Sequence, residues 1–448
     1  MSFLRKIFKY PKIPTGRYTY RGVGELAKMA LQLRVEPNHQ GLLVINANTV
    51  LYLNETATVH AYFLMQGMPI DEAVENVQRM YHVKKATARS EHEKLIFTIS
   101  TLAQTEKVCP VSYLDVKQVE PFTQPVSAPL RMDLALTFRC QNKCVHCYAG
   151  GSHETAELST HEWKTIITKL GEIGVFIVTF TGGEPTLRED LPDLLTFAQE
   201  NGVVTGLITN GRRLADRNYV QRLGGAGLDF VQITLESHKA TVHNRITGVK
   251  GSWTETVRGI KNAVETEIYV TTNTTLNMQN ADGFLETIDF IKDLGVAAFG
   301  CNSLIYSGKG AEVSDQIALQ TESLEELLRD IKEKAAHLGL KFLWYTPTQY
   351  CQLDPVKLGL GVKSCTAAQV NMCIAPNGDV YPCQSYFESL GSILKEKWIT
   401  IWNHPLAKRI RNREYIEPKC EECPQLAVCG GGCPLELEYR KYLCSSTN

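Results

Sequence analysis

The sequence predicts an α/β protein: a partial barrel of six β/α units, with a small α+β domain before it and a cysteine-rich domain after it. In residues 131–320, short apolar runs alternate with helical patterns, which indicates βα units and a parallel sheet. Nine of the fourteen cysteines lie from Cys351 to Cys444. A proline-containing stretch precedes the barrel. We therefore expect an N-terminal domain (1–105), a linker (106–130), the barrel (131–320), a bridge (321–350) and a cysteine-rich domain (351–448).

The N-terminal domain is expected to be winged-helix-like. Leu42–Ile45 and Val50–Leu53 are apolar runs separated by turn residues, a hairpin pattern. Asn54 is expected to cap a first helix, and Asp71 a second helix that ends near Tyr81. A third helix follows. The basic residues before Glu25 are interpreted as a solvated or linker-like tail.

Six strands are expected in the barrel, and chemistry in such barrels lies at the carboxyl ends of the strands. The expected strands are Met132–Phe138, Phe176–Thr181, Val204–Thr209, Phe230–Leu235, Ile268–Asn273 and Ala297–Ile305, with helices such as Thr160–Ile173, Thr254–Glu265 and Phe284–Leu294 between them.

Composition indicates a globular protein of a reducing compartment. The net charge is −1, so no bulk field recruits nucleic acid or a membrane. No run approaches the roughly 18 apolar residues of a membrane span. Pro11 and Pro14 stand where a signal peptide would have its apolar core, so we expect the cytoplasm, where cysteines usually bind metal or do chemistry.

Three cysteines follow the first barrel strand with the spacing C-x3-C-x2-C: Cys140, Cys144 and Cys147. Three thiolates from one loop hold three irons of a 4Fe–4S cube and leave the fourth open. The open iron can be chelated by S-adenosylmethionine (SAM), and an electron from the cluster then yields a 5′-deoxyadenosyl radical. The competing interpretation is a zinc site, although zinc favours four ligands and C-x2-C pairs.

The second strand ends in Thr181-Gly-Gly-Glu184-Pro, and glycines let backbone approach a ligand closely. Together with the three-cysteine loop, this sequence resembles the radical SAM superfamily. The resemblance implies that backbone here pairs with the SAM amino group, with Glu184 as a negative partner. It also implies that Thr234 lies near the ribose and that Arg245 pairs with the carboxylate, although Arg245 also fits an ordinary surface arginine. The full set of implied SAM contacts is Tyr148, Gly182, Gly183, Glu184, Asn210, Thr234, Glu236 and Arg245.

The C-terminal cysteines resemble the SPASM domain, which carries two auxiliary 4Fe–4S clusters in peptide-modifying radical SAM enzymes. The motif runs Cys365-x12-Gly-x4-Cys383, then Cys420-x2-Cys423-x5-Cys429-x3-Cys433, then Cys444. The resemblance assigns Cys420, Cys423, Cys429 and Cys444 to the second cluster, and Cys365, Cys383 and Cys433 to the first. Two structural zinc sites are the alternative.

The first auxiliary cluster needs a fourth ligand. Cys351 is the candidate by resemblance; the alternative is a cluster open to substrate. Cys373 is a second candidate, but it lies in an apolar run and is interpreted as core; Cys109 and Cys301 are interpreted as structural. Sulfatase-maturing relatives carry an acid directly after the second motif cysteine, whereas this chain has Gln384, which cannot accept a proton.

Residues 41–70 resemble a PqqD-like domain, which takes a leader peptide as an added strand at a sheet edge. A winged helix also suits DNA, but Asp71, Glu72 and Glu75 disfavour phosphate contact. A purely structural role is the third possibility.

We therefore expect a radical SAM peptide maturase with three 4Fe–4S clusters. Its expected partners are a precursor peptide and an electron donor such as flavodoxin or ferredoxin, with neither nucleic acid nor membrane. The alternatives are an enzyme that modifies a small molecule, such as a tetrapyrrole side chain, and a non-catalytic iron–sulfur electron carrier or scaffold.

Overall fold

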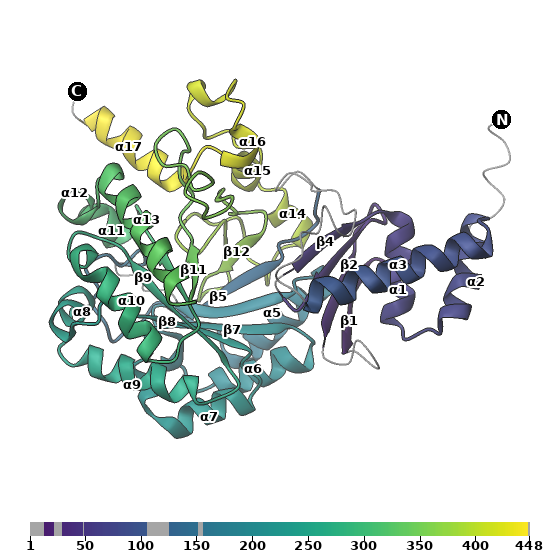
Figure 1. Cartoon of the computed structure of the whole chain (residues 1–448), viewed down its shortest axis with the longest axis horizontal. Helices are drawn as coiled ribbons and strands as arrows, with labels where there is room; N and C mark the ends of the chain where they lie inside the picture. The colour runs from purple at the N-terminus through teal and green to yellow at the C-terminus, as the bar shows by residue number, and fades with distance from the viewer. Residues whose placement is uncertain (1–12, 22–28, 48, 105–124, 151–155, 447–448) are drawn as a thin grey trace. The chain divides into compact units, whose positions relative to one another are not determined.

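The computed structural model describes residues 13–21, 29–47, 49–104, 125–150 and 156–446. The chain divides into two compact units (Figure 1). The first comprises residues 1–128 with 168–176, and the second comprises residues 129–167 with 177–448. Each unit is described by itself.

The described residues of the first unit form an antiparallel sheet and three helices. The strands are β1 (Gly16–Arg21), β2 (Ala30–Val35), β3 (Gly41–Ile45) and β4 (Thr49–Leu53), in that order across the sheet. The helices are α1 (Glu55–Met65), α2 (Ile70–Tyr81) and α3 (Lys85–Gln104). As expected, Asn54 caps α1, and its Oδ1 accepts a hydrogen bond from the Ala57 N–H at 2.9 Å. Apolar side chains of the strands and all three helices form one core.

Three expectations for this region were wrong. The sheet has four strands rather than the two of a single hairpin, because β1 and β2 precede it. Arg17 belongs to β1 and not to a solvated tail. Asp71 does not cap α2: Pro69 occupies the N-cap, and Asp71 lies in the first turn, where it pairs with Arg89. Periodicity alone did not reveal β1 because it carries few aliphatic side chains.

The second unit is built on a nine-stranded sheet with the order β11-β10-β9-β8-β7-β6-β5-β12-β13. Every pair from β11 to β12 is parallel. The strands are β5 (Arg131–Thr137), β6 (Ile177–Gly182), β7 (Val204–Thr209), β8 (Phe230–Thr234), β9 (Tyr269–Thr275), β10 (Ala298–Asn302), β11 (Lys341–Trp344), β12 (Asn371–Ile374) and β13 (Val380–Tyr381). Six of these match the six expected barrel strands to within a few residues.

Helices accompany the strands, as βα alternation predicts. They are α5 (Thr160–Ile173), α6 (Leu191–Glu200), α7 (Arg217–Gly225), α8 (Ala240–Thr247), α9 (Ser252–Val264), α10 (Phe284–Asp293), α11 (Gly308–Glu312), α12 (Ser314–Ile317) and α13 (Thr321–His337). The cysteine-rich region adds α14 (Trp398–Trp402), α15 (Pro405–Arg411), α16 (Leu426–Cys429) and α17 (Pro434–Ser446).

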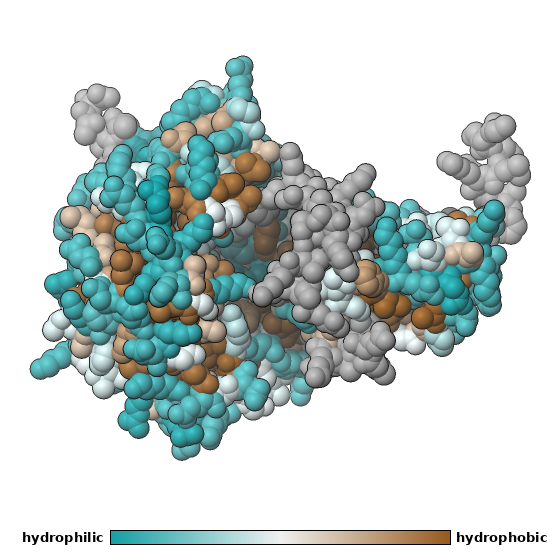
Figure 2. Space-filling view, in the orientation of Figure 1, coloured by the Kyte–Doolittle hydropathy of each residue, from teal (hydrophilic) through white to brown (hydrophobic). Residues whose placement is uncertain are grey.

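The cysteine-rich region is not only loop: its strand β12 lies beside β5 and extends the barrel sheet. Cys373 lies in β12 and is buried, as is Cys301 in β10, in agreement with their interpretation as core and structural cysteines. Cys109 lies outside the described residues. Polar side chains cover much of the visible face of the protein (Figure 2). In the part of the chain that the structure describes, no helix has the length and apolar character needed to cross a membrane.

Candidate active site

The sequence motifs meet at the carboxyl edge of the parallel sheet, because each follows the end of a neighbouring strand. Cys140 comes three residues after β5, Gly183 directly follows β6, Asn210 directly follows β7, and Glu236 comes two residues after β8. This edge therefore gathers residues that are up to about a hundred positions apart in the sequence.

The three-cysteine loop brings its thiols close to one another. Burial raises the pKa of the Cys140 thiol to about 11, and Cys147 adds to that rise. Burial likewise raises the pKa of Cys144, with further contributions from Glu236, Cys147 and Cys140. Thiols with a raised pKa stay protonated at neutral pH, and a metal or cluster replaces their protons when it binds.

Backbone and amide groups donate to these sulfurs. The Asn142 N–H lies 3.4 Å from Cys140 Sγ, and Asn210 Nδ2 lies 3.8 Å from the same sulfur. The backbone of Ala149 donates to Cys147. Hydrogen bonds to thiolate sulfur are one of the means by which proteins set the properties of iron–sulfur clusters.

Neighbouring elements fix the backbone of the loop. The Lys143 and Val145 N–H groups donate to carbonyls at the end of α8, at 2.9 Å each. The Lys309 N–H of α11 donates to the Cys147 carbonyl at 3.0 Å. The Arg212 guanidinium donates to the Gln141 carbonyl at 3.2 Å and to Asn142 Oδ1 at 2.9 Å. The sequence analysis missed Arg212 and Lys309; for Arg212, the available signal was its place two residues after Asn210.

Gly182 and Gly183 bring β6 against the start of this loop. Gly183 N–H donates to the Thr137 carbonyl at 2.7 Å, and Glu184 N–H donates to the Arg139 carbonyl at 2.8 Å. A Cβ on Gly183 would lie 2.4 Å from the Arg139 oxygen. Gly182 has a φ of +132°. In this structure the glycines therefore permit close approach of one backbone segment to another, directly before Cys140.

Glu184 is fully buried, and its carboxylate is occupied by protein donors. Oε1 accepts from the Thr186 backbone and hydroxyl at 3.1 and 2.6 Å and from the Thr209 hydroxyl at 2.7 Å, while Oε2 accepts from the Asn210 N–H at 2.8 Å. Burial raises its pKa. These contacts hold the ends of β6 and β7 together, and the role of Glu184 as a negative partner for SAM stays a prediction.

The remaining expected SAM contacts occupy different surroundings. Glu236 is buried, and its Oε1 lies 3.2 Å from Nε2 of His146, inside the three-cysteine loop. Tyr148 hydrogen-bonds to Thr181 at the end of β6, and burial raises its pKa. Thr234 is the last residue of β8 and is half-buried.

Arg245 is exposed. Its guanidinium donates to the side chain and carbonyl of Gln279, at 3.1 and 3.3 Å. These contacts fit the surface-arginine interpretation.

The SPASM-type cysteines fall into two groups. Cys433 and Cys383 both raise the pKa of Cys365, after the larger effect of burial, and burial raises the pKa of Cys433 itself to about 12. These three form the first auxiliary group. Their sulfurs accept backbone N–H groups of Ala367, Ser385, Tyr386, Leu435 and Glu436.

The second auxiliary group contains Cys420, Cys423 and Cys429 on adjacent turns between Pro418 and α16. Cys351, expected beside the first group, is placed differently. After burial, Cys351 has the largest effect on the pKa of Cys420, and the residue before it donates its N–H to Cys429 Sγ. The structure therefore places Cys351 near the second group. Cys444 lies in the last turn of α17, where the structure does not describe side chains.

The donor chemistry fits iron–sulfur clusters at these three places. The described thiols of these three places are buried or half-buried except Cys140 and Cys351, and backbone N–H groups point at the sulfurs of Cys140, Cys383 and Cys433. Among the described residues, no three His, Cys, Asp or Glu side chains stand close enough together to hold one metal ion. A 4Fe–4S cube spaces its thiolates more widely than a single ion with Zn–S bonds of about 2.3 Å.

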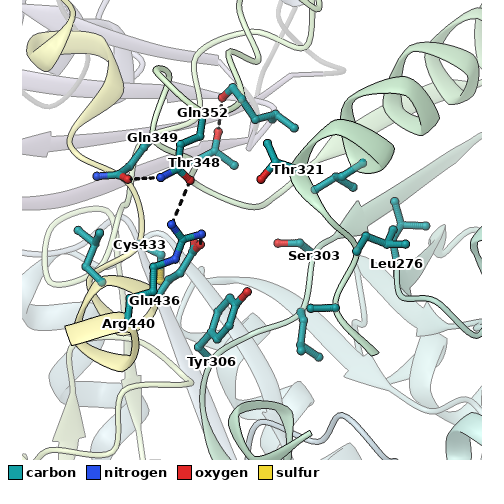
Figure 3. A pocket seen from close by; sticks show the side chains of 16 residues that line it. Leu276, Ser303, Tyr306, Thr321, Thr348, Gln349, Gln352, Cys433, Glu436 and Arg440 are labelled. Carbon is teal, nitrogen blue, oxygen red and sulfur yellow. Dashed lines mark hydrogen bonds and ion pairs between the residues drawn. The ribbon is translucent and has the colours of Figure 1, made fainter. Parts of the chain in front are cut away.

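A pocket lies between the strand ends of the barrel and α17 (Figure 3). Leu276, Ser303 and Tyr306 line it from the barrel side, and Cys433 and Arg440 from the other side. The Arg440 guanidinium donates to Glu436 Oε1 at 2.5 Å and to Gln352 Oε1 at 3.2 Å. Burial raises the pKa of Glu436, although Arg440 opposes the shift. This pocket brings a first-group cysteine next to polar side chains from three segments.

Comparison with known proteins agrees with this geometry. Residues 134–291 match the radical SAM superfamily, and residues 365–424 match the SPASM iron–sulfur cluster-binding domain. The mycofactocin maturase MftC of Mycolicibacterium smegmatis is 30% identical over 327 residues, which cover 70% of this chain and 80% of MftC. The chain belongs to the radical SAM superfamily.

This radical SAM enzyme has relatives of more than one kind. Fe-coproporphyrin III synthase of Methanosarcina barkeri is 28% identical over 334 residues, covering 68% of this chain and 82% of that protein. The crystal structure of Streptococcus suis SuiB bound to S-adenosylmethionine aligns with a TM-score of 0.69 at 18% identity, over 90% of this chain and 94% of SuiB. SuiB bound to its precursor peptide SuiA aligns with a TM-score of 0.67 at 18% identity, over 93% and 96%.

The cofactors of this enzyme are SAM and 4Fe–4S clusters. When bound, the cluster of the three-cysteine loop supplies the electron that cleaves SAM to methionine and a 5′-deoxyadenosyl radical. Cys140, Cys144 and Cys147 are the residues that would hold it, and Arg212, Asn210 and Lys309 hold the loop that carries them.

Proposed function

We propose that this radical SAM enzyme matures a ribosomally made precursor peptide, with the leader of that peptide docking on the N-terminal domain. The observation that carries the proposal is the edge strand β4. In the described part of the chain β4 is the last strand in the sheet order, the position at which a peptide adds a strand. Val50 and Tyr52, on one face of β4, are 36% and 44% exposed, which offers apolar contact for a peptide.

The comparisons support a peptide substrate. MftC is a maturase, and the alignment with SuiB, a protein solved with a precursor peptide, extends over nine-tenths of this chain. The PqqD-like interpretation of residues 1–105 belongs to the same proposal, as does an electron donor of the flavodoxin or ferredoxin class.

A substrate test follows from the proposal. The reconstituted enzyme is incubated with SAM, a reductant and the peptide encoded by a small open reading frame beside its gene. We expect 5′-deoxyadenosine and a peptide of changed mass, and neither product with the Cys140, Cys144 and Cys147 to Ala triple variant. A peptide of unchanged mass, in a sample that still produces 5′-deoxyadenosine, would count against this peptide as substrate.

Modification of a tetrapyrrole is the second candidate, because Fe-coproporphyrin III synthase is among the relatives. The test supplies a tetrapyrrole precursor of iron coproporphyrin III in place of the peptide, with iron coproporphyrin III as the product standard. Conversion of the tetrapyrrole, together with an unchanged peptide, would favour this alternative over maturation.

Docking at β4 has its own test. Tyr52→Pro removes a backbone donor and restricts the strand, whereas Tyr52→Thr removes the ring and keeps the donor. We expect the Pro variant to bind the precursor more weakly than the Thr variant, measured by fluorescence anisotropy of a labelled peptide. If both variants fold and bind the precursor as tightly as the parent enzyme, the peptide docks at another edge.

A further inference from the structure

The segment that carries Cys351 lies against the loop of the second auxiliary group. The Tyr350 N–H donates to Cys429 Sγ at 3.4 Å, and that sulfur lies 3.7 Å from the Thr348 carbonyl. Tyr350 is buried, and its hydroxyl accepts the Lys363 N–H at 2.9 Å. The backbone next to Cys351 is therefore held within hydrogen-bonding distance of a second-group sulfur.

A second contact places the other side of this loop beside the same segment. Gln349 Nε2 donates to Glu417 Oε2 at 2.8 Å, and the Glu417 carbonyl accepts the Cys420 N–H at 2.8 Å. Cys351 therefore follows two residues that contact both ends of the stretch from Glu417 to Cys429.

The first auxiliary group lies near the same segment without a hydrogen bond to it. Cys433 lines the pocket that Thr348, Gln349 and Gln352 also line. Among the described residues, however, the hydrogen bonds between residues 348–352 and a cysteine sulfur go to Cys429. The resemblance assigned Cys351 by its position in the sequence, and the fold carries that position to the other group.

We propose that Cys351 is the fourth protein ligand of the cluster held by Cys420, Cys423 and Cys429. It then takes the role that the resemblance gives to Cys444. Among the cysteines whose side chains the structure describes, the first group is left with three thiols, one of which, Cys433, lines the pocket beside Arg440. A substrate group entering that pocket would approach the cluster of the first group.

The test uses the full-length chain in which Cys140, Cys144 and Cys147 are replaced by Ala, so that only auxiliary iron remains, about eight irons per chain on the 4Fe–4S assignment. Cys365→Ser and Cys420→Ser then identify the electron paramagnetic resonance signals of the first and second clusters after reduction. Cys351→Ala and Cys444→Ala are compared with these references, with Cys373→Ala as a control cysteine that holds no cluster. The measurements are the spectra and the iron content.

We expect Cys351→Ala to alter the signal that Cys420→Ser alters, and to reduce its amplitude by at least about twofold because a direct ligand is lost. The signal identified by Cys365→Ser, along with the circular dichroism spectrum, should remain as in the parent. An effect of Cys351→Ala on the first signal overturns the proposal. Two unchanged signals overturn it as well, and an effect of Cys444→Ala alone on the second signal then returns that ligand to Cys444.

Discussion

Replacement of Gly183 by Ala should dislodge the three-cysteine loop. The new Cβ would lie 2.4 Å from the Arg139 oxygen and 2.5 Å from the Phe138 oxygen, both backbone atoms. The segments that follow β5 and β6 therefore have to move apart, and the hydrogen bonds from the Gly183 and Glu184 N–H groups, at 2.7 and 2.8 Å, are lost. Each such bond contributes about 1 kcal/mol, and overpacking costs about 1–3 kcal/mol, so the local penalty is about 3–5 kcal/mol.

Because Cys140 follows Arg139 directly, this displacement acts on the first cluster ligand. We expect Gly183→Ala to lose most of the SAM-cleaving cluster, about four of some twelve irons, while the auxiliary clusters remain. Iron analysis, reduced spectra with and without SAM, and 5′-deoxyadenosine formation measure this. Gly225→Ala is the matched control, since its Cβ meets no atom within 4 Å and it ends helix α7. A Gly183→Ala enzyme with full iron and normal SAM cleavage would refute the steric argument.

Three further outcomes are expected. Triple replacement of Cys140, Cys144 and Cys147 by Ala should abolish 5′-deoxyadenosine formation and leave about eight auxiliary irons; continued reductive cleavage would show that another site binds SAM. Arg212→Gln should lower the cluster content of the same loop, because it weakens charged hydrogen bonds that contribute about 1.5–3 kcal/mol. Replacement of the exposed Arg258 by Gln should leave the cluster content unchanged, and iron analysis compares the two variants. Finally, burial lowers the pKa of His60 to about 4, and His92, whose Nδ1 lies 3.1 Å from Nδ1 of His60, adds to the shift. Because this folded pKa is below the unfolded value of 6.5, the free energy of unfolding of the first unit should fall as the pH drops from 6.5 toward 4. The fall should be smaller in His60→Gln, and pulse proteolysis in urea measures it.

Much of the second unit could be predicted from the sequence, because the patterns that identify its strands and helices are local. Buried parallel strands appear as continuous apolar runs, and the expected Thr160–Ile173 coincides with α5. The sequence also indicated the glycines at the end of β6. The neighbours of Gly183, however, are the carbonyls of Phe138 and Arg139, which follow β5, and β5 is paired with β6 only in the folded protein.

The parts that sequence could not supply depend on contacts between distant segments. The role of Glu184 depends on Thr209 and Asn210, about 25 positions away, which occupy its carboxylate. The position of Cys351 depends on a contact with residue 429 that no spacing rule encodes. Strand β1 was missed because its polar and aromatic residues lack the aliphatic alternation that identifies a strand.

The pairing of β12 with β5 limits how this enzyme can exchange parts with its relatives. Cys365 precedes β12, and Cys383 follows β13, so the first auxiliary group encloses the two strands that complete the barrel sheet. A chimera joined before Cys365 must fill the edge of β5 with a foreign strand. One joined between Tyr381 and Cys383 keeps the native ladder but divides the ligands of one cluster between two parents. The C-terminal region therefore cannot be exchanged between relatives as an independent domain. Among relatives, we expect substitutions in β5 to be accompanied by substitutions in β12, because the two strands are paired.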